Sequence, residues 1–402
     1  MKSNIIAAAL FAATTGAIVL YPLDQGNATT SPHLPITTTG AVPHATEASR
    51  IDVVFVLDTT SSMGGMIEAA KEKIWSIAST LGSAQQAPEI RMGLVAFRDR
   101  GDAYVTRVVD LSADLDTMYA TLMDYQAVGG GDGPESVNQA LYDAIVKMSW
   151  SQDPSAYKTV FLVGDAPPHM DYAEDVKYPE TLGIAKDRGI VVNSIQCGDM
   201  PGTAAQWQRI AQLGGGRFFQ VEQAGSAVAI ATPYDGQLAT ISRKLDDTRL
   251  YYGTEEERAV QGRKLKATDK LHASSTLASR ARRAAFNASA SGKSNLLGDG
   301  ELVRDVLEGR VDLSAIEPDQ LPESLQAKSP AEQKVIIDDT ARKRGELQRE
   351  IRTLAQKRST YIREELEGMG GAKDSLDEKI YRTVREQAAR VGLSYKDNSS
   401  AY

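Results

Sequence analysis

Cysteine is almost absent from this chain. Cys197 is the only one among 402 residues, so no intramolecular disulfide can form, and outside the cell a free thiol is tolerated only where it is buried. A chain of this length exceeds one ordinary hydrophobic core. We therefore expect two structural units.

The chain also lacks an excess of positive charge. Its formal net charge is −8 at pH 7, which argues against a general nucleic-acid binder, because contacts to phosphates require clustered lysine and arginine. Apolar content of 42% and charged content of 24% are those of a soluble globular protein. The negative balance suits cation binding where acidic side chains converge.

Apolar runs long enough to span a bilayer are missing after the N-terminal segment. Residues 5–23 form such a run behind Lys2, which predicts a secretory signal or an uncleaved membrane anchor over residues 1–28. A buried helix is the alternative. Residues 29–48, rich in Thr, Pro, Ser and Gly, indicate a linker. We expect an exported protein, periplasmic or extracellular, that meets a membrane only through its N-terminal segment.

Residues 49–247 alternate between strand-like and helix-like patterns. Short apolar runs rich in β-branched residues predict strands at 51–58, 90–97, 104–111, 159–165, 189–196 and 217–221. An apolar helical face follows the first strand, at Met63, Ile67, Ala70, Ile74, Ile77 and Leu81. Pro134 is expected to open a second helix. The alternation predicts an α/β fold with a doubly wound, mostly parallel sheet covered on both faces.

Polar side chains stand where these strands end. In "VVFVLDTTSSM" (53–63), Asp58 ends the first strand and is followed by Thr60 and Ser62. Asp165 ends a later strand, and "GGGDGPES" (129–136) carries Asp132 and Glu135 ahead of the second helix. Ligands of such sheets bind beyond the carboxyl ends of the strands. We expect the three loops to meet at that edge.

Each of these residues alone has an ordinary explanation, because Ser, Thr and Asp are favoured helix caps. Together they favour a metal site, since carboxylates that face one another repel unless they are protonated or bound to a cation. Carboxylate and hydroxyl oxygens are the ligands that Mg²⁺ and Ca²⁺ prefer. His169 is the only His or Cys in these loops, which disfavours zinc or a redox metal. In an extended loop, residues 58, 60 and 62 would aim their oxygens the same way.

The stretch "VVFVLDTTSSM" resembles the metal-ion-dependent adhesion site of von Willebrand factor A domains, whose first loop is Asp-x-Ser-x-Ser. The resemblance extends from residue 51 to near 247. "DGPE" (132–135) is similar to the Asp-x-Pro-Glu loop of integrin β subunits, in which the Glu is a metal ligand. "GDAPPH" (164–169) is similar to the third loop of the same subunits. The resemblance implies a Rossmann-like fold and these metal ligands: Asp58, Thr60, Ser62, Glu135 and Asp165.

The sequence also departs from the integrin β pattern. Gly65 and Met66 replace two aspartates that help to bind an adjacent cation, and Gly130 replaces an asparagine that serves a third. Asp132 remains as the candidate ligand of a secondary metal. The opening stretch is also similar to the von Willebrand A domain attached to some eukaryotic alpha-kinases, although no kinase-like sequence is found in this chain.

Residues 248–402 change character and become helical and highly charged. Ser329-Pro330-Ala331-Glu332 is a capping box. Leu347, Ile351, Leu354 and Tyr361 recur along the helix it opens, and a second helix is expected from residue 375 to about 391. The two helices form either a hairpin, packed on itself or on the first domain, or a coiled-coil or partner-binding module. No resemblance assigns this region a function.

We expect an exported, non-enzymatic binding protein that holds one Mg²⁺ or Ca²⁺. The resemblance implies that an acidic side chain of a protein partner completes the coordination of the ion. One alternative is a scaffold with a degenerate, structural metal site. Another is a metal-dependent hydrolase with His169 as general base.

Overall fold

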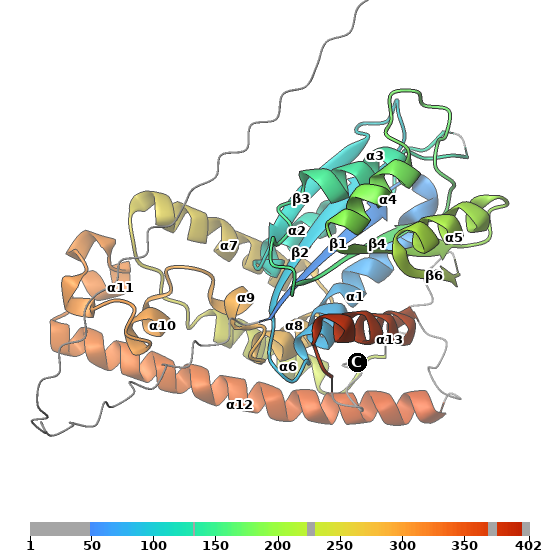
Figure 1. Cartoon of the computed structure of the whole chain (residues 1–402). Coiled ribbons are helices and arrows are strands. Elements are labelled where there is room, and N and C mark those ends of the chain that lie inside the picture. Colours follow the sequence, from blue (N-terminus) through green and yellow to red (C-terminus); the bar gives the residue numbers. More distant parts are fainter. Residues whose placement is uncertain (1–48, 132, 223–229, 369–375, 396–402) are drawn as a thin grey trace, which may run out of the picture. The chain divides into compact units, whose positions relative to one another are not determined.

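The computed structural model describes residues 49–131, 133–222, 230–368 and 376–395 (Figure 1). The expected signal or anchor (1–28) and the expected linker (29–48) lie outside these residues, as does Asp132. Among the helices that are described, none is both long and apolar enough to cross a membrane.

A six-stranded sheet lies at the centre of the first part of the chain. Its strands are β1 (Arg50–Asp58), β2 (Glu89–Phe97), β3 (Thr106–Ser112), β4 (Tyr157–Gly164), β5 (Ile190–Cys197) and β6 (Gly215–Val221). They lie in the order β3-β2-β1-β4-β5-β6, and every neighbouring pair is parallel except β2 with β3. All six predicted strands are present, and the predicted fold class is confirmed.

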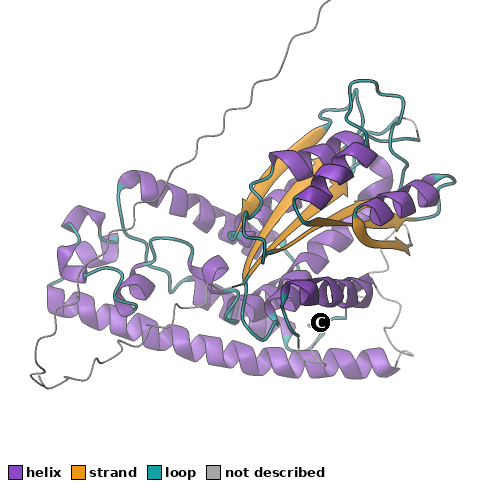
Figure 2. Cartoon of the chain, in the orientation of Figure 1, coloured by secondary structure: helices purple, strands orange, loops and turns teal. Residues whose placement is uncertain are grey.

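Helices cover both faces of the sheet (Figure 2). Val53 of β1 packs in the core formed with α1 (Gly64–Gly82) and α2 (Leu115–Asp124). The next residue, Val54, packs in the opposite core, formed with α3 (Val137–Tyr142), α4 (Tyr178–Asp187) and α5 (Thr203–Leu213). This switch follows from the alternation of side chains along a strand. It explains why central strands such as β1 are buried and apolar at nearly every position.

Helix α3, the helix expected to open at Pro134, begins later than predicted. Pro134 does not open it, because Glu135 is held in extended conformation by its neighbours: its amide donates to the Pro167 carbonyl at 2.9 Å, and its carbonyl accepts from the His169 amide at 3.0 Å. The α-helix starts at Val137 and passes into a π-helical turn over Asp143–Lys147.

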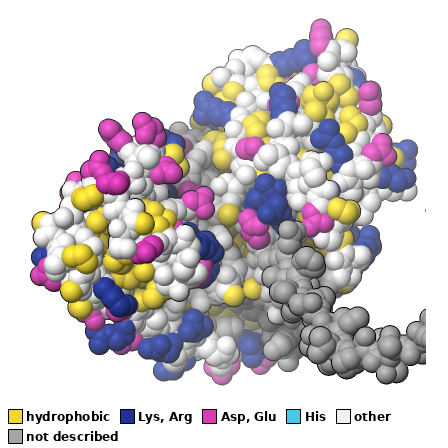
Figure 3. All heavy atoms as spheres, turned by 60° about the vertical axis from the view of Figure 1, so that its left-hand side comes forward, with side chains coloured by type: hydrophobic (Ala, Val, Ile, Leu, Met, Phe, Trp, Pro, Cys, Tyr) yellow, Lys and Arg dark blue, Asp and Glu magenta, His cyan; other side chains and the backbone are white. Residues whose placement is uncertain are grey.

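The rest of the chain is helical, as predicted. The helices are α6 (Asp235–Asp246), α7 (Glu255–Ser274), α8 (Leu277–Asn287), α9 (Lys293–Leu297), α10 (Leu302–Leu307), α11 (Glu323–Gln326), α12 (Pro330–Gly368) and α13 (Leu376–Ala388). Short 3₁₀ turns lie at Ser61–Met63, Leu313–Ala315, Pro318–Gln320 and Ala389–Val391. Figure 3 shows acidic and basic side chains interspersed over this region. The predicted capping box opens α12, where the Ser329 amide donates to the Glu332 carboxylate at 2.8 Å.

The two C-terminal helices pack against different partners. Leu347, Ile351 and Leu354 of α12 lie in a core formed with α6 and α8. Ile380 and Val384 of α13 lie instead in the core beneath the sheet, against α1. Over their described residues, the two helices therefore do not form the expected hairpin packed on itself. Helix α13 packs on the sheet domain, and α12 packs on α6 and α8.

A buried ion-pair network joins the helical region to the sheet domain. Arg283 of α8 donates to Asp116 of α2 at 2.7 and 2.5 Å and to Asp246 of α6 at 2.7 and 3.0 Å. The three side chains are almost completely buried. Residues from Glu47 onward group into one compact unit. The domain boundary expected near residue 247 stays a prediction.

Candidate metal centre

The first loop folds back on the carboxylate that ends β1. Oδ1 of Asp58 accepts hydrogen bonds from the amide and the hydroxyl of Thr60, at 2.8 and 2.6 Å. Ser62 does not continue an extended loop as predicted, because Ser61–Met63 form a 3₁₀ turn. Its hydroxyl still lies 3.4 Å from that of Thr60, so the turn keeps the three oxygen-bearing side chains together.

Backbone hydrogen bonds fasten the second loop to the first. The Gly129 carbonyl accepts from the Ser61 amide at 3.1 Å and from the Ser61 hydroxyl at 2.7 Å. Gly130 adopts a φ of +78°, and a Cβ there would lie 3.1 Å from Cβ of Thr60 and 3.2 Å from Oε1 of Glu135. The absence of a side chain at Gly130 thus lets Thr60 and Glu135 lie on either side of one backbone position.

The third loop meets both of the others. Asp165 follows the last residue of β4, which is the strand beside β1. The bridge between Glu135 and Pro168 ties this loop to the second. A Cβ on Gly164 would lie 3.1 Å from Oδ2 of Asp58, so the first and third loops are in contact. The structure therefore brings all five predicted ligands to the carboxyl edge of the sheet, as the sequence predicted.

The carboxyl groups at this edge are buried and repel one another. Burial raises the pKa of Asp58 to about 7, with a further rise from the charge of Asp165 and a partial offset from the Thr60 hydrogen bonds. Burial raises the pKa of Glu135 to about 9, and the nearby charges of Asp58 and Asp99 add to the rise. Such shifts arise where carboxylates converge away from water.

Two buried carboxylate oxygens at this edge of the sheet indicate that a cation would fit there. Oδ2 of Asp58 and Oε2 of Glu135 are inaccessible to water and have no hydrogen-bond partner among the described residues. Carboxylate and hydroxyl oxygens of this kind suit Mg²⁺ or Ca²⁺. Across the described part of the chain, no three His, Cys, Asp or Glu side chains form a metal site by themselves. A cation here would therefore depend on the hydroxyl groups of Thr60 and Ser62 as well.

Two acidic residues beside the site escaped the sequence analysis. Asp99 follows β2 and accepts hydrogen bonds from Ser136 at 2.9 Å and from Tyr172 at 2.8 Å. Asp102 accepts from the Gly130 amide at 3.0 Å. Both belong to "FRDRGD" (97–102), directly after a strand adjacent to β1. The rule that located Asp58 and Asp165 would have located this loop too.

His169 is committed to neighbouring side chains. Its ring stacks on Tyr172 with the centroids 3.9 Å apart. Nδ1 lies 2.8 Å from Asp171, and Nε2 lies 3.4 Å from Asp99. These contacts hold the third loop against the end of β2. The imidazole of His169 therefore has a structural role.

The segment that contains the candidate metal centre matches a known domain family. Residues 52–223 match a family model described as von Willebrand factor A domain. This segment is a von Willebrand factor A domain. The predicted resemblance is confirmed at that level, and the likeness of the second and third loops to integrin β subunits stays a prediction.

The solved structures that match part of the chain share little sequence with it. Proximal thread matrix protein 1 from the mussel byssus is 15% identical, over 44% of this chain and 42% of that one, with a TM-score of 0.33. The von Willebrand A domain of SpRpn10 is 12% identical, over 44% of this chain and 89% of that one, with a TM-score of 0.34. The mussel protein was also solved with its adhesion-site motif occupied by zinc.

A curated relative shares more sequence identity with part of this chain. Alpha-protein kinase vwkA of Dictyostelium discoideum is 29% identical over 121 residues, which are 30% of this chain. The match spans 19% of that protein, about a fifth of its length. The predicted similarity to alpha-kinases that carry a von Willebrand A domain thus has a counterpart in a relative named as an alpha-kinase.

Proposed function

We propose that this von Willebrand A domain binds a protein partner through a divalent cation. Asp58, Thr60, Ser62, Glu135 and Asp165 would hold the ion. The observation that carries the proposal is the pair of buried, unpartnered carboxylate oxygens on Asp58 and Glu135. Leaving such atoms without a partner is costly, and a cation would satisfy both of them.

The bound ion would supply a Lewis-acidic point that accepts a carboxylate from the partner. Mg²⁺ and Ca²⁺ both match the oxygen donors. The protein residues would position the ion and offset its charge. Asp132 stays a candidate for a secondary metal outside the described residues.

The role that we propose is binding and not catalysis. His169, the residue considered as a general base, is engaged with Tyr172 and Asp171. A screen of phosphoesters and peptides, with and without a chelator, tests this part. If a substrate is hydrolysed and the chelator abolishes that activity, the binding proposal is wrong and the protein is a metal-dependent hydrolase.

We further propose that the protein is exported, on the strength of the apolar run at residues 5–23. Mass spectrometry of the mature N-terminus, purified from the source cells, tests this. An intact N-terminus on a protein recovered from the cytosol would contradict it.

Titration calorimetry tests the metal site. Mg²⁺ and Ca²⁺ are titrated into the metal-stripped chain and into Asp58→Asn, with Asp338→Asn as the matched control because Asp338 lies exposed on α12. We expect Asp58→Asn to weaken cation binding by about tenfold or more, which corresponds to about 1.4 kcal/mol. We expect Asp338→Asn to bind like the wild type.

The second stage adds a short acidic peptide to each metal-loaded protein. Binding of the peptide that is lost in EDTA supports the adhesion role. Cation binding without any effect on the peptide would favour the structural-scaffold alternative, and a wild type that binds neither cation would contradict the proposal outright.

A further inference from the structure

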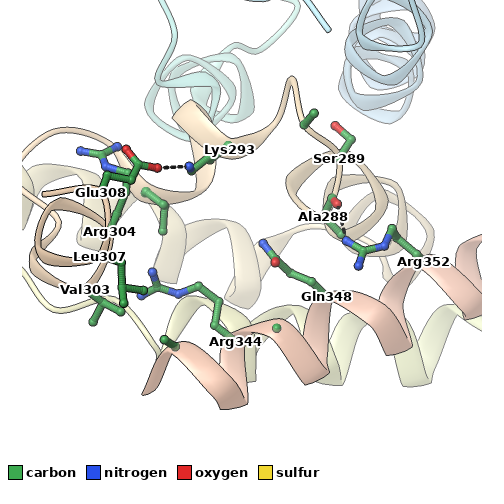
Figure 4. Close-up of a pocket in the computed structure, with 14 residues that line it drawn as sticks. Ala288, Ser289, Lys293, Val303, Arg304, Leu307, Glu308, Arg344, Gln348 and Arg352 are labelled. Carbon is green, nitrogen blue, oxygen red and sulfur yellow. Dashed lines mark hydrogen bonds and ion pairs between the residues drawn. The ribbon is translucent and has the colours of Figure 1, made fainter. Parts of the chain in front are cut away.

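Two cavities outside the metal centre have basic linings, and they differ in how their cations are paired. The first, of about 440 Å³, lies between α10 and α12 (Figure 4). Lys293 pairs there with Glu308, Arg304 with Asp305 at 2.9 Å, and Arg344 with Glu301 at 2.8 Å. Its buried positive charge is thus already compensated by the protein.

The second cavity, of about 800 Å³, lies at the amino end of the sheet. It is bounded by the segment that leads into β4, the turn from α4 into β5, and Val391. Because β4 begins at Tyr157 and β5 at Ile190, this cavity is at the edge opposite to the metal centre. Lys158, Lys186 and Arg188 line it, and Asp187 is the acid among its described lining residues.

Lys158 is the unusual member of this lining. Its side chain is 8% exposed, and its ammonium group donates one hydrogen bond, 3.3 Å long, to the Ser151 carbonyl. No described carboxylate lies within 4.0 Å of it, and Asp153 acts on it only from a longer distance. By contrast, Arg91 has Asp52 at 2.6 Å. An ammonium group carries three donors, and burying it without a counter-charge is costly.

We propose that this cavity binds a small phosphorylated molecule. Lys158, Lys186 and Arg188 provide the charge that a phosphate dianion requires, and the arginine fork suits its tetrahedral oxygens. The volume lies in the range of small-molecule sites and exceeds what a free phosphate fills. Met148, Trp150 and Val391 provide apolar surface for the organic part of the ligand.

Calorimetry with three probes tests the proposal: inorganic phosphate, AMP and citrate. All titrations use the full chain in EDTA, so that a failure here is separate from any failure of the metal site. We expect AMP to bind more tightly than inorganic phosphate, because only AMP reaches the apolar surface. We expect Lys158→Met to weaken both by about tenfold or more. Lys334→Met, at an exposed lysine of α12, is the control and should leave binding unchanged.

Arg188→Gln provides a second variant at an exposed position. Its guanidinium donates to the Ile145 carbonyl at 2.8 Å, and the unfolding midpoint of the variant shows whether losing this bond disturbs the fold. We expect the variant to weaken phosphate binding as well, with an unaltered unfolding midpoint. Three results would overturn the proposal: no binding of phosphate or AMP at millimolar concentration, equal affinity in both variants and the wild type, or binding of citrate alone.

Discussion

Glu135 decides how much negative charge surrounds the proposed ion. With Asp58 and Asp165 it places three carboxyl groups near one point, and the rise in its pKa to about 9 reflects burial and that crowding. A third carboxylate strengthens the attraction to a divalent cation. It also neutralises part of the charge of the ion, so that an acidic partner is attracted less strongly.

The variant Glu135→Thr tests this reasoning. Because Ca²⁺ accommodates a bidentate carboxylate more easily than octahedral Mg²⁺ does, we expect weaker Ca²⁺ binding, a shift of preference toward Mg²⁺ and a stronger dependence on the acidic peptide. Competitive titration of Ca²⁺ and Mg²⁺ into the wild type and the variant measures the affinity for each ion and the preference between them. If the threonine variant binds Ca²⁺ as tightly as the wild type, Glu135 is not a ligand.

Gly164 controls how closely the first and third loops approach. A Cβ at this position would lie 3.0 Å from Cβ of Asp58 and 3.1 Å from the Trp207 ring. We expect Gly164→Ala to lower the free energy of unfolding by about 1–3 kcal/mol through overpacking, and to weaken cation binding. Gly183→Ala is the control for an added Cβ in open space. Because Gly183 lies within α4, we expect this variant to gain up to about 1 kcal/mol from helix propensity, and Gly164→Ala is therefore compared with the wild type as well. Equal unfolding midpoints and affinities in the two variants would show that the approach is not tight.

At the scale of elements, the contact of α2, α6 and α8 rests on charge. Burial alone would raise the pKa of Asp116 and Asp246, but the charge of Arg283 outweighs it and lowers the pKa of Asp246 to about 2 and that of Asp116 still further. A carboxyl group whose pKa is lower in the folded than in the unfolded state stabilises the fold above its unfolded pKa, near 4. That stabilisation is lost as the pH falls from about 4 toward 2.

Urea unfolding measured between pH 6 and pH 2 tests this. We expect the free energy of unfolding to fall steeply below about pH 4 in the wild type. Arg283→Met should lose about 3 kcal/mol at pH 6, because it removes the main counter-charge of two buried carboxylates. Asp116 then keeps only Lys264 at 4.0 Å, and Asp246 keeps Arg249 at 3.6 Å and His272 at 2.7 Å. In this variant protonation relieves the repulsion, so we expect its stability to fall less steeply, or to rise, as the pH falls. If the free energies of unfolding of the wild type and of Arg283→Met change in parallel with pH, the pairing of Arg283 with Asp116 and Asp246 is not the source of the pH dependence.

Periodicity predicted the elements better than their ends. The apolar runs located every strand. Central strands such as β1 and β4 are buried on both faces and leave a continuous signal, whereas the edge strand β3 is largely exposed and was located by its β-branched residues. The start of α3 was misplaced because Pro134 and Glu135 have good local helix-start chemistry, and a tertiary bridge to Pro168 overrides it. The residues Asp58 and Asp165 could be predicted from strand ends alone. The burial of the Lys158 ammonium without a carboxylate in ion-pair contact could not be predicted, because burial and pairing depend on the whole fold.

At the scale of the whole molecule, the C-terminal helices complete the core of the sheet domain. Gln387 of α13 donates to Asn193 of β5 at 2.9 Å and accepts from Tyr157 of β4 at 2.7 Å. Phe286 of α8 packs on Trp75 of α1 with the ring centroids 6.0 Å apart. The sequence showed a helical, charged region but not these contacts, since they join residues far apart along the chain.

A fragment of residues 49–247 tests this dependence. It lacks Arg283, Phe286 and Gln387, so Asp116 loses its arginine partner and part of the core is exposed. We expect the fragment to unfold at lower urea concentration than the full chain, or not to fold. Circular dichroism during urea titration measures both proteins. Equal midpoints would show that residues 248–402 contribute nothing to the stability of the sheet.

Strand β1 connects the residues that precede Arg50 to the edge at which a partner would be held. It is paired along its length with β2 on one side and with β4 on the other, both in parallel. A pulling force that entered at Asp58 and left through Arg50 would run along these two ladders. Their hydrogen bonds lie across that direction and would share the load together instead of opening one after another. The fold therefore places the proposed adhesion site at the end of a strand that is held by two ladders at once.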